Sequence, residues 1–456
     1  MSLNKVTAQV MGLLVVFALE TSVLNATSSD ALIDILVKKG VLTKQEAEEV
    51  RADLLSEAMG PPEEKITLKG DSYITKFTLY GDARLRFQWE NAQEEGPTFD
   101  ANGEDENRFR YRYRLRLGAE YQFLDDFKAG VRLETSESSD STNVDFGGYF
   151  DKTGDDVYIG LAYLEYENED IFDLGLVDYF NFTVGKQTFI KRFMMQKAWW
   201  DGDINPEGLS AQLGWEDVYI DGLNLTLRSG AYVVSDEDDR VRGSEDGDGF
   251  LFVEQAEFAY SWQPKTGIKF APSFMFESNG HFTNPEDAGT PDNENAYASV
   301  GDYYVFFMPV ELTWNMLGYP QMLYGTYGVN FQDETTATNF GANAQSEGHN
   351  QFFNIGYQWG KAKKKGSWQI GAEYRYYGAF AYSPNLSDSD FAKNATNQHG
   401  IVFKVKYAMT DYLYLAGTYF HSNAIDGTAG ANGFNEFAGS EFSQVDLLQI
   451  DLNWKY

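Results

Sequence analysis

Five arginines alternate with apolar residues within the segment 107–123. They are Arg108, Arg110, Arg112, Arg114 and Arg116. Residues two apart on an extended strand point to the same side, so this spacing predicts one strand face with five positive charges. In a narrow aqueous gap such a face would attract anions and order water. The alternative is structural, with the arginines only pairing with acidic residues and holding the fold in shape.

The two neighbouring segments extend this basic face. Because Leu79, Leu85 and Phe87 share one face of the segment before it, the opposite face carries Lys76, Asp82, Arg84 and Arg86. The segment after it adds Lys128, Arg132 and Glu134. The predicted basic wall consists of Arg84, Arg86, Arg108, Arg110, Arg112, Arg114, Arg116, Lys128 and Arg132.

The connection 187–206 is the candidate partner of this wall. Its charged residues, with the residue that follows it, are Lys191, Arg192, Lys197, Asp201, Asp203 and Glu207. If the connection folds toward the wall, Asp201, Asp203 and Glu207 would face the arginines across a constriction. The alternative is a surface loop whose Trp199 and Trp200 pack on the rim.

The residues that could support catalysis or metal binding show no such pattern. The chain has no cysteine, which excludes thiol chemistry and zinc fingers. The segment 201–207 alternates acids as a calcium loop does, but it lacks the glycine and the distal glutamate of an EF-hand. The histidines fall near different connections, at His281, His349, His399 and His421. We therefore expect no enzyme activity, no metal site and no cofactor.

The composition limits the elements that hold these residues. The chain has 456 residues, a formal charge of −33 and 16% aromatic residues. The acidic balance argues against nucleic-acid binding, which needs a basic face. A mean hydropathy of −0.42 excludes a helical membrane protein. It is compatible with strands that alternate polar and apolar residues.

The N-terminal region differs from the rest. Lys5 followed by the apolar run 10–19 predicts a signal peptide over residues 1–26. Asp30 and the capping box Thr43–Glu46 predict two short helices, and Gly60-Pro61-Pro62 marks a linker. We therefore assign residues 27–64 to a helical extension with its linker, and residues 65–456 to the main domain.

From about residue 73 onward the hydrophobic period is two. About sixteen such runs are joined by eight long and seven short connections in strict alternation. This layout predicts an all-β transmembrane fold, an antiparallel β-barrel of about sixteen strands around an aqueous lumen. The polar face of each strand would line water and the apolar face would meet lipid. An aromatic girdle at the short-connection ends would include Tyr121, Phe123, Phe127, Trp454 and Tyr456.

Several segments resemble the putative porin family of Gram-negative outer membranes. They are the helical start 31–47, Gly81–Arg86, Trp200–Gly208, and the C-terminal residues Leu452, Trp454 and Tyr456. The last three resemble the signal read by the barrel-assembly machinery. The resemblance implies an outer-membrane porin for passive diffusion of small hydrophilic solutes and ions. It also implies contact with lipid and lipopolysaccharide, homotrimers, and a periplasmic location of the N-terminal extension and the C-terminus.

Two other functions stay open. The arginine row suggests a channel selective for anions or phosphate, and the acidic exterior fits a structural or adhesive surface protein. The eight long connections hold about 34 acidic and 7 basic residues, so the negative charge belongs mainly to them. The strand faces predicted to line the lumen are basic instead.

Overall fold

The computed structural model describes residues 74–94, 106–124, 126–136, 141–147, 156–168, 177–235, 249–278, 303–331, 350–378, 381–383, 386–425 and 442–456. All of them belong to the compact unit Glu63–Tyr456. The predicted signal peptide and helical extension, with His281 and His349, lie outside the described residues. Among the described residues, no helix has the length and hydrophobicity needed to cross a membrane.

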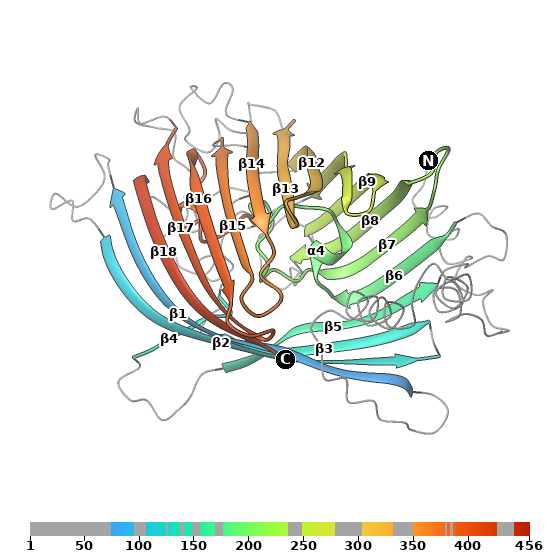
Figure 1. Cartoon of the computed structure of the whole chain (residues 1–456), viewed down its shortest axis with the longest axis horizontal. Helices are drawn as coiled ribbons and strands as arrows, with labels where there is room; N and C mark the ends of the chain where they lie inside the picture. The colour runs from blue at the N-terminus through green and yellow to red at the C-terminus, as the bar shows by residue number, and fades with distance from the viewer. Residues whose placement is uncertain are drawn as a thin grey trace, which may run out of the picture. The chain divides into compact units, whose positions relative to one another are not determined.

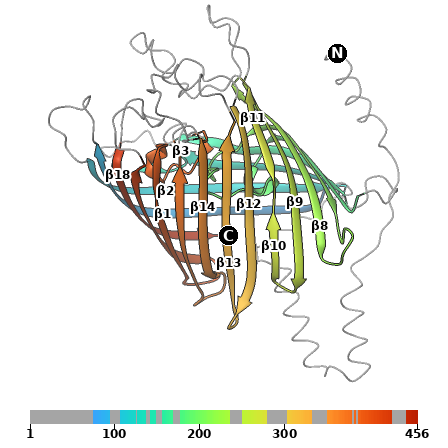
Figure 2. The same cartoon turned by 90° about the horizontal axis from the view of Figure 1, so that it is seen from above.

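Alternation of polar and apolar residues gives a single antiparallel sheet that closes on itself (Figures 1 and 2). The first half contains β1 (Ile74–Glu94), β2 (Glu106–Phe123), β3 (Phe127–Ser136), β4 (Val144–Asp145), β5 (Asp156–Asn168), β6 (Tyr179–Lys186), β7 (Glu207–Trp215), β8 (Leu223–Ser235) and β9 (Gly249–Gln263). The second half contains β10 (Thr266–Phe270), β11 (Ser273–Ser278), β12 (Tyr303–Met316), β13 (Tyr319–Asn330), β14 (Gln351–Gly360), β15 (Trp368–Tyr377), β16 (Gln398–Ala408), β17 (Leu413–Ala424) and β18 (Phe442–Lys455).

These eighteen segments form sixteen wall strands in the described part of the chain. β10 and β11 both pair with β9 and β12, so they are two parts of one strand interrupted at Ala271 and Pro272. β4 is a two-residue pairing between the second long connection and β2. β1 pairs with both β2 and β18, which closes the barrel. The predicted sixteen-stranded antiparallel β-barrel is confirmed.

Closure depends on a close approach between the first and last strands. Gly81 and Tyr456 exchange two backbone hydrogen bonds, with N···O distances of 3.1 and 3.2 Å. A Cβ atom on Gly81 would lie 2.4 Å from the carbonyl oxygen of Arg116 and 2.4 Å from the Tyr456 hydroxyl. Glycine is therefore needed at this position for the C-terminal residue to reach the seam.

The outer surface of the wall is apolar, with aromatic residues gathered near the short connections. Leu85, Phe109 and Leu115 are all roughly half-exposed on this surface. Ring pairs at the short-connection end include Phe123 with Phe127, Tyr319 with Trp359, Trp368 with Tyr407 and Trp454 with Tyr456.

The inner surface is not uniformly polar, which corrects the prediction that it only lines water. A buried apolar cluster lies inside the barrel along β8–β15, and its members include Tyr232, Val253, Met275, Phe307, Phe352 and Tyr377. Phe193, Trp199 and Trp200 of the third long connection belong to the same cluster. Inward apolar residues therefore pack against a connection that occupies this part of the lumen.

Candidate functional site

The remaining lumen is a polar cavity of about 1390 Å³. Its lining follows β1 from Tyr80 to Glu90 and β18 from Lys455 to Val445. The same cavity thus extends along the wall from near the short connections toward the long ones. Fourteen basic and nine acidic residues line it, so its described lining carries an excess of positive charge.

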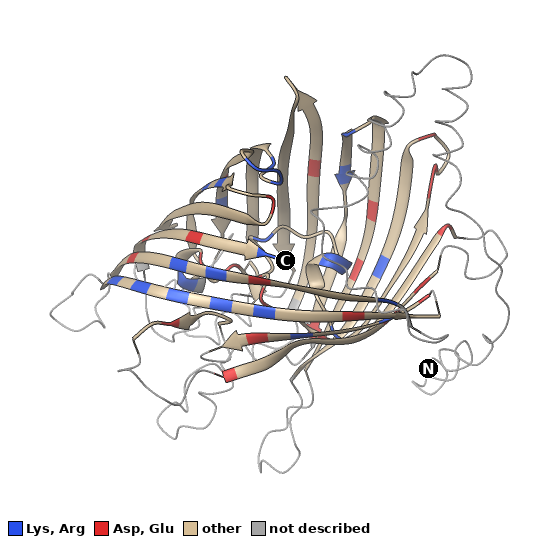
Figure 3. Cartoon of the chain, turned by 60° about the horizontal axis from the view of Figure 1, so that its bottom comes forward, with Lys and Arg blue, Asp and Glu red and all other residues tan. Residues whose placement is uncertain are grey.

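All five arginines of β2 line this cavity, and each has a carboxylate within ion-pair distance. Arg108 and Arg112 pair with Asp145, at 3.4 and 2.6 Å. Arg110 pairs with Glu90 at 3.1 Å. Figure 3 shows these basic positions recurring along one long strand. The row is thus neutralised in large part by carboxylates, as the structural alternative expects.

Arg114 and Arg116, the last two arginines of the row, have the same two carboxylate partners. Arg114 contacts Asp82 at 3.0 Å and Asp203 at 3.2 Å, and Arg116 contacts the same two carboxylates at 3.3 and 3.5 Å. Asp82 belongs to the wall, whereas Asp203 belongs to the third long connection. The basic wall therefore holds that connection from one side.

The other predicted wall residues divide by position. Arg84 and Arg86 line the cavity from β1, and Arg132 lines it from β3. Arg86 makes a two-pronged contact with Asp451, at 2.8 and 3.0 Å, and Arg132 contacts Glu134 at 3.0 Å. Lys128 does not line the cavity. It contacts Glu165 at 2.8 Å and Glu167 at 3.1 Å.

The third long connection, residues 187–206, crosses the inside of the barrel. It begins with the one-turn helix α4 (Phe189–Arg192), which Figure 1 shows within the ring of strands. The Gln255 side chain accepts from the Met194 N–H and donates to the Met194 carbonyl. Trp199 Nε1 donates to Asn354 of β14 at 2.8 Å. Together with the Asp203 contacts, these bonds fix the connection to opposite walls.

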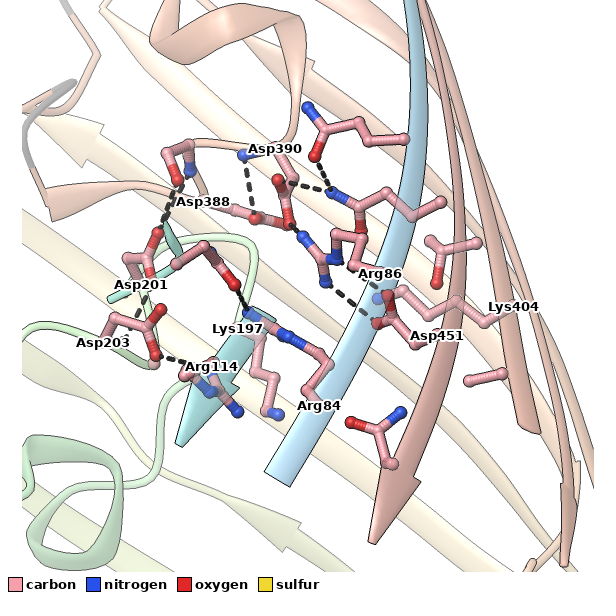
Figure 4. Close-up of a pocket in the computed structure, with 18 of the residues that line it drawn as sticks. Arg84, Arg86, Arg114, Lys197, Asp201, Asp203, Asp388, Asp390, Lys404 and Asp451 are labelled. Carbon is pink, nitrogen blue, oxygen red and sulfur yellow. Dashed lines mark hydrogen bonds and ion pairs between the residues drawn. The ribbon is translucent and has the colours of Figure 1, made fainter. Parts of the chain in front are cut away.

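The seventh long connection, which joins β15 to β16, also folds inward in its described residues, which the sequence did not indicate. Asp201 N–H donates to the Leu386 carbonyl at 2.8 Å, and Asp388 N–H donates to the Ala198 carbonyl at 3.2 Å. The Ser389 hydroxyl donates to Asp201 at 2.8 Å. The third and seventh connections are therefore hydrogen-bonded to each other within the lumen, as Figure 4 shows around Asp201 and Asp388.

A buried arginine of the wall holds the seventh connection in place. Arg375 of β15 is 1% exposed, and it contacts Glu373 at 3.1 Å and Asp388 at 2.7 Å. Its guanidinium also lies 5.1 Å from the centre of the Phe391 ring. The pairing of Arg375 with Asp388 could not be predicted from local sequence spacing, because it depends on the path of the seventh connection.

Four of the six predicted constriction residues face the cavity, namely Lys191, Lys197, Asp201 and Asp203. Arg192 does not face the cavity. It is the last residue of α4, and its side chain contacts Glu165 of β5 and Asn181 of β6 instead. Glu207 differs from the prediction as well. It is the first residue of β7, shares its outward face with Leu209, and contacts Lys186 at 3.0 Å.

The carboxyl groups of the third connection titrate differently. Burial and the nearby Asp203 and Asp388 raise the pKa of Asp201 to about 6. Burial acts in the same direction on Asp203, but Arg114, Arg116 and Arg84 outweigh it and hold the pKa of Asp203 well below its usual value. At neutral pH Asp203 is ionised, whereas Asp201 is close to its titration range.

The acids and histidines in the described part of the chain form no cluster that could hold a metal ion. The alternating acids of the segment 201–207 do not converge, since Asp203 faces arginines and Glu207 faces outward. His421 contacts Asp446 at 2.8 Å, and His399 contacts Tyr374 at 3.3 Å.

A closed polar lumen behind an apolar surface is the arrangement of a channel, and comparison with known proteins identifies the family. Residues 81–280 and 315–456 match the putative porin family. The chain belongs to that family. It is therefore a porin of this family, and the matched residues include the seam, the basic wall and the third connection. Curated proteins offer no match to this sequence.

Three solved structures are similar to this chain at low sequence identity. Salmonella typhi OmpF in complex with daunomycin is 14% identical, covers 84% of this chain and 98% of its own, and has a TM-score of 0.45. Pseudomonas putida OprB at high pH is 8% identical, with 83% and 94% covered and a TM-score of 0.49. Vibrio cholerae OmpT is 11% identical, with 86% and 100% covered and a TM-score of 0.44. The family match, not these structures, decides the assignment.

Proposed function

We propose that this porin forms a water-filled channel for passive diffusion of small hydrophilic solutes and ions, and that it favours anions over cations. The observation that supports the preference is the cavity lining, where fourteen basic residues stand against nine acidic ones. An excess of one charge in a confined aqueous path raises the local concentration of the opposite ion. The net charge of the whole chain, −33, points the other way.

The arginine row is not by itself a phosphate ladder in this proposal. Each of its five guanidinium groups is engaged by a carboxylate, so a permeating anion meets a partly neutralised wall. The row's role is to balance the acids of the wall and the third connection. The anion preference then depends on the surplus cations elsewhere in the lining.

The placement of the protein in the cell completes the proposal. Residues 1–26 direct export and are removed, and residues 27–64 form a periplasmic extension. The short connections and the C-terminus face the periplasm, and the acidic long connections face outward beside lipopolysaccharide. The strand ending in Leu452, Trp454 and Tyr456 carries the signal for the barrel-assembly machinery, and three copies assemble as a homotrimer.

Planar bilayers test the preference directly. A gradient of KCl across a membrane that contains the purified porin should give a reversal potential of the sign expected for chloride selectivity. A reversal potential of cation sign would contradict the anion preference. Swelling of porin-containing liposomes in small sugars tests the diffusion pathway, and liposomes that do not swell would contradict it.

A further inference from the structure

A second group of cations lines the same cavity without carboxylate partners. Lys197, Lys406, Lys455 and Arg84 all line the lumen, and none has an acidic oxygen within 4.0 Å among the described residues. The side chain of Arg84 donates to the Asn143 amide oxygen, which is neutral. In contrast, every arginine of the β2 row is paired.

These unpaired cations come together from the third connection, from the two seam strands β1 and β18, and from β16 nearby. Lys406, Tyr414 and Lys455 occupy the neighbouring strands β16, β17 and β18. The Nζ atoms of Lys406 and Lys455 lie 5.7 and 5.9 Å from the centre of the same Tyr414 ring. A cation over an aromatic face is attracted to it, so Tyr414 holds both ammonium groups in place.

Two further cations approach this pair. Arg84 lies on β1, in register with Asn453 of β18. Lys197 extends from the third connection, and Figure 4 shows Lys197 and Arg84 reaching into the same part of the pocket. Lys197, Lys455 and Lys404 all lie near enough to Lys406 to repel its charge, and the carboxylate of Asp451 lies near enough to attract it.

Bringing like charges together in this way costs free energy. Burial and the charges of Lys404 and Lys455 lower the pKa of Lys197, although the carboxylates of Asp388 and Asp203 act in the opposite direction. Tyr414 contributes an attraction but no countercharge. A ligand with two negative charges could interact with several of these cations at once, and its binding would relieve their mutual repulsion.

We infer that Lys197, Lys406, Lys455 and Arg84, arranged around Tyr414, form a binding site for a small oxyanion with two negative charges, of the phosphate class. A monovalent anion would bind this site more weakly because it offsets only one positive charge. The site would add anion binding to the proposed channel function. It rests on that function only because phosphate must enter the lumen to reach it. The site lies beside the seam and borders the paired arginine row, because Arg84 is the cross-strand partner of Arg114.

Inorganic phosphate in planar bilayers is the probe. With KCl on both sides at pH 7.4, where phosphate is mostly doubly charged, added phosphate should reduce the chloride current in a saturable way. Acetate at the same concentration should not. The double variant Lys406→Gln with Lys455→Gln should raise the half-inhibitory phosphate concentration about tenfold or more, because it removes two charge-assisted contacts.

Two matched variants serve as controls. Lys363→Gln with Lys364→Gln removes the same charge from the exposed connection 361–367, at the same end of the barrel, and should leave phosphate inhibition unchanged. Lys406→Arg with Lys455→Arg keeps the charge and should retain inhibition. Porin whose folding is confirmed by heat-modifiable mobility in detergent gels is used throughout.

The outcomes separate this site from the proposed function. If the wild-type channel favours chloride in KCl but phosphate has no saturable effect, the site is refuted and the anion preference stands. Equal inhibition of the wild type and the Lys406→Gln, Lys455→Gln variant also refutes it. If saturable inhibition requires these lysines while KCl gradients give a cation sign, the site stands and the general anion preference fails.

Discussion

Arg114 of β2 and Asp203 of the third long connection are 3.2 Å apart, measured from guanidinium nitrogen to carboxylate oxygen. This contact joins the basic wall to the connection that crosses the lumen. Arg116 contacts the same oxygen at 3.5 Å, and the Thr142 hydroxyl donates to the other oxygen of Asp203 at 2.8 Å. Asp203 is therefore both a countercharge for the wall and an anchor for the connection.

Replacing this anchor should increase anion selectivity. Asp203→Asn removes one negative charge from the lining and leaves Asp82 as the ion-pair partner of Arg114 and Arg116. We expect the reversal potential in a KCl gradient to move toward the chloride limit. Asp221→Asn, which removes an exposed carboxylate from a short connection, is the control and should leave the potential unchanged. Identical potentials for both variants would contradict a role of Asp203 in the permeation path.

The arginine row should disfavour cation permeation even though each of its arginines is paired with a carboxylate. Arg110→Gln with Arg112→Gln removes two positive charges and leaves Glu90 and Asp145 less neutralised. We expect the barrel to assemble and its selectivity to shift toward cations, as measured by the reversal potential. Lys128→Gln with Lys361→Gln removes equal charge away from the cavity lining and serves as the control. Unchanged selectivity in the arginine variant would contradict a location of the row on the permeation path.

Selectivity should also depend on pH through Asp201. Because the pKa of Asp201 is raised to about 6, the side chain gains its proton as the pH falls from 7 to 5. The cavity loses one negative charge, so anion preference should increase over this range. The stabilisation from the bound proton is present at low pH and is lost as the pH rises through about 6. Reversal potentials at pH 7 and 5 test the effect, which Asp201→Asn should greatly reduce. A variant with the full wild-type pH dependence would exclude Asp201 as its source.

Local sequence patterns were sufficient to predict the wall. Alternation along β2 fixes the faces of Phe109 and Arg110, because a shift of one residue would place charges against lipid. The same reasoning failed for β14. Phe352 and Phe353 are adjacent and both apolar, and only the inward packing of Trp199 explains why Phe352 is buried inside the barrel. An apolar residue can face lipid or an inserted connection, and alternation does not distinguish the two.

The candidate site depended more strongly on long-range contacts. The sequence could place Asp203 opposite the arginines only on the condition that the third connection folds toward the wall, and in the structure Arg114 and Arg116 both contact Asp203. The hydrogen bond from Ser389 to Asp201 joins residues 188 positions apart, and no local sequence pattern predicts it. Glu207 was assigned to the constriction because it follows the connection, yet as the first residue of β7 it points outward. The unpaired state of Lys406 and Lys455 likewise became apparent only once their neighbours were placed.

Trp199 should control how firmly the third connection narrows the lumen. Its side chain is 1% exposed, its ring centroid lies 4.6 Å from that of Phe352 and 5.4 Å from that of Tyr377, and its Nε1 donates to Asn354. Trp199→Ala removes these contacts, and large-to-small changes of this kind cost about 3–5 kcal/mol. We expect single-channel conductance to rise and to fluctuate more, because the connection is released from one wall while the strands stay paired. Trp368→Ala, at a 47% exposed position on the outer surface, is the matched control and should keep wild-type conductance. If folded Trp199→Ala porin also keeps wild-type conductance, the third connection does not limit the current.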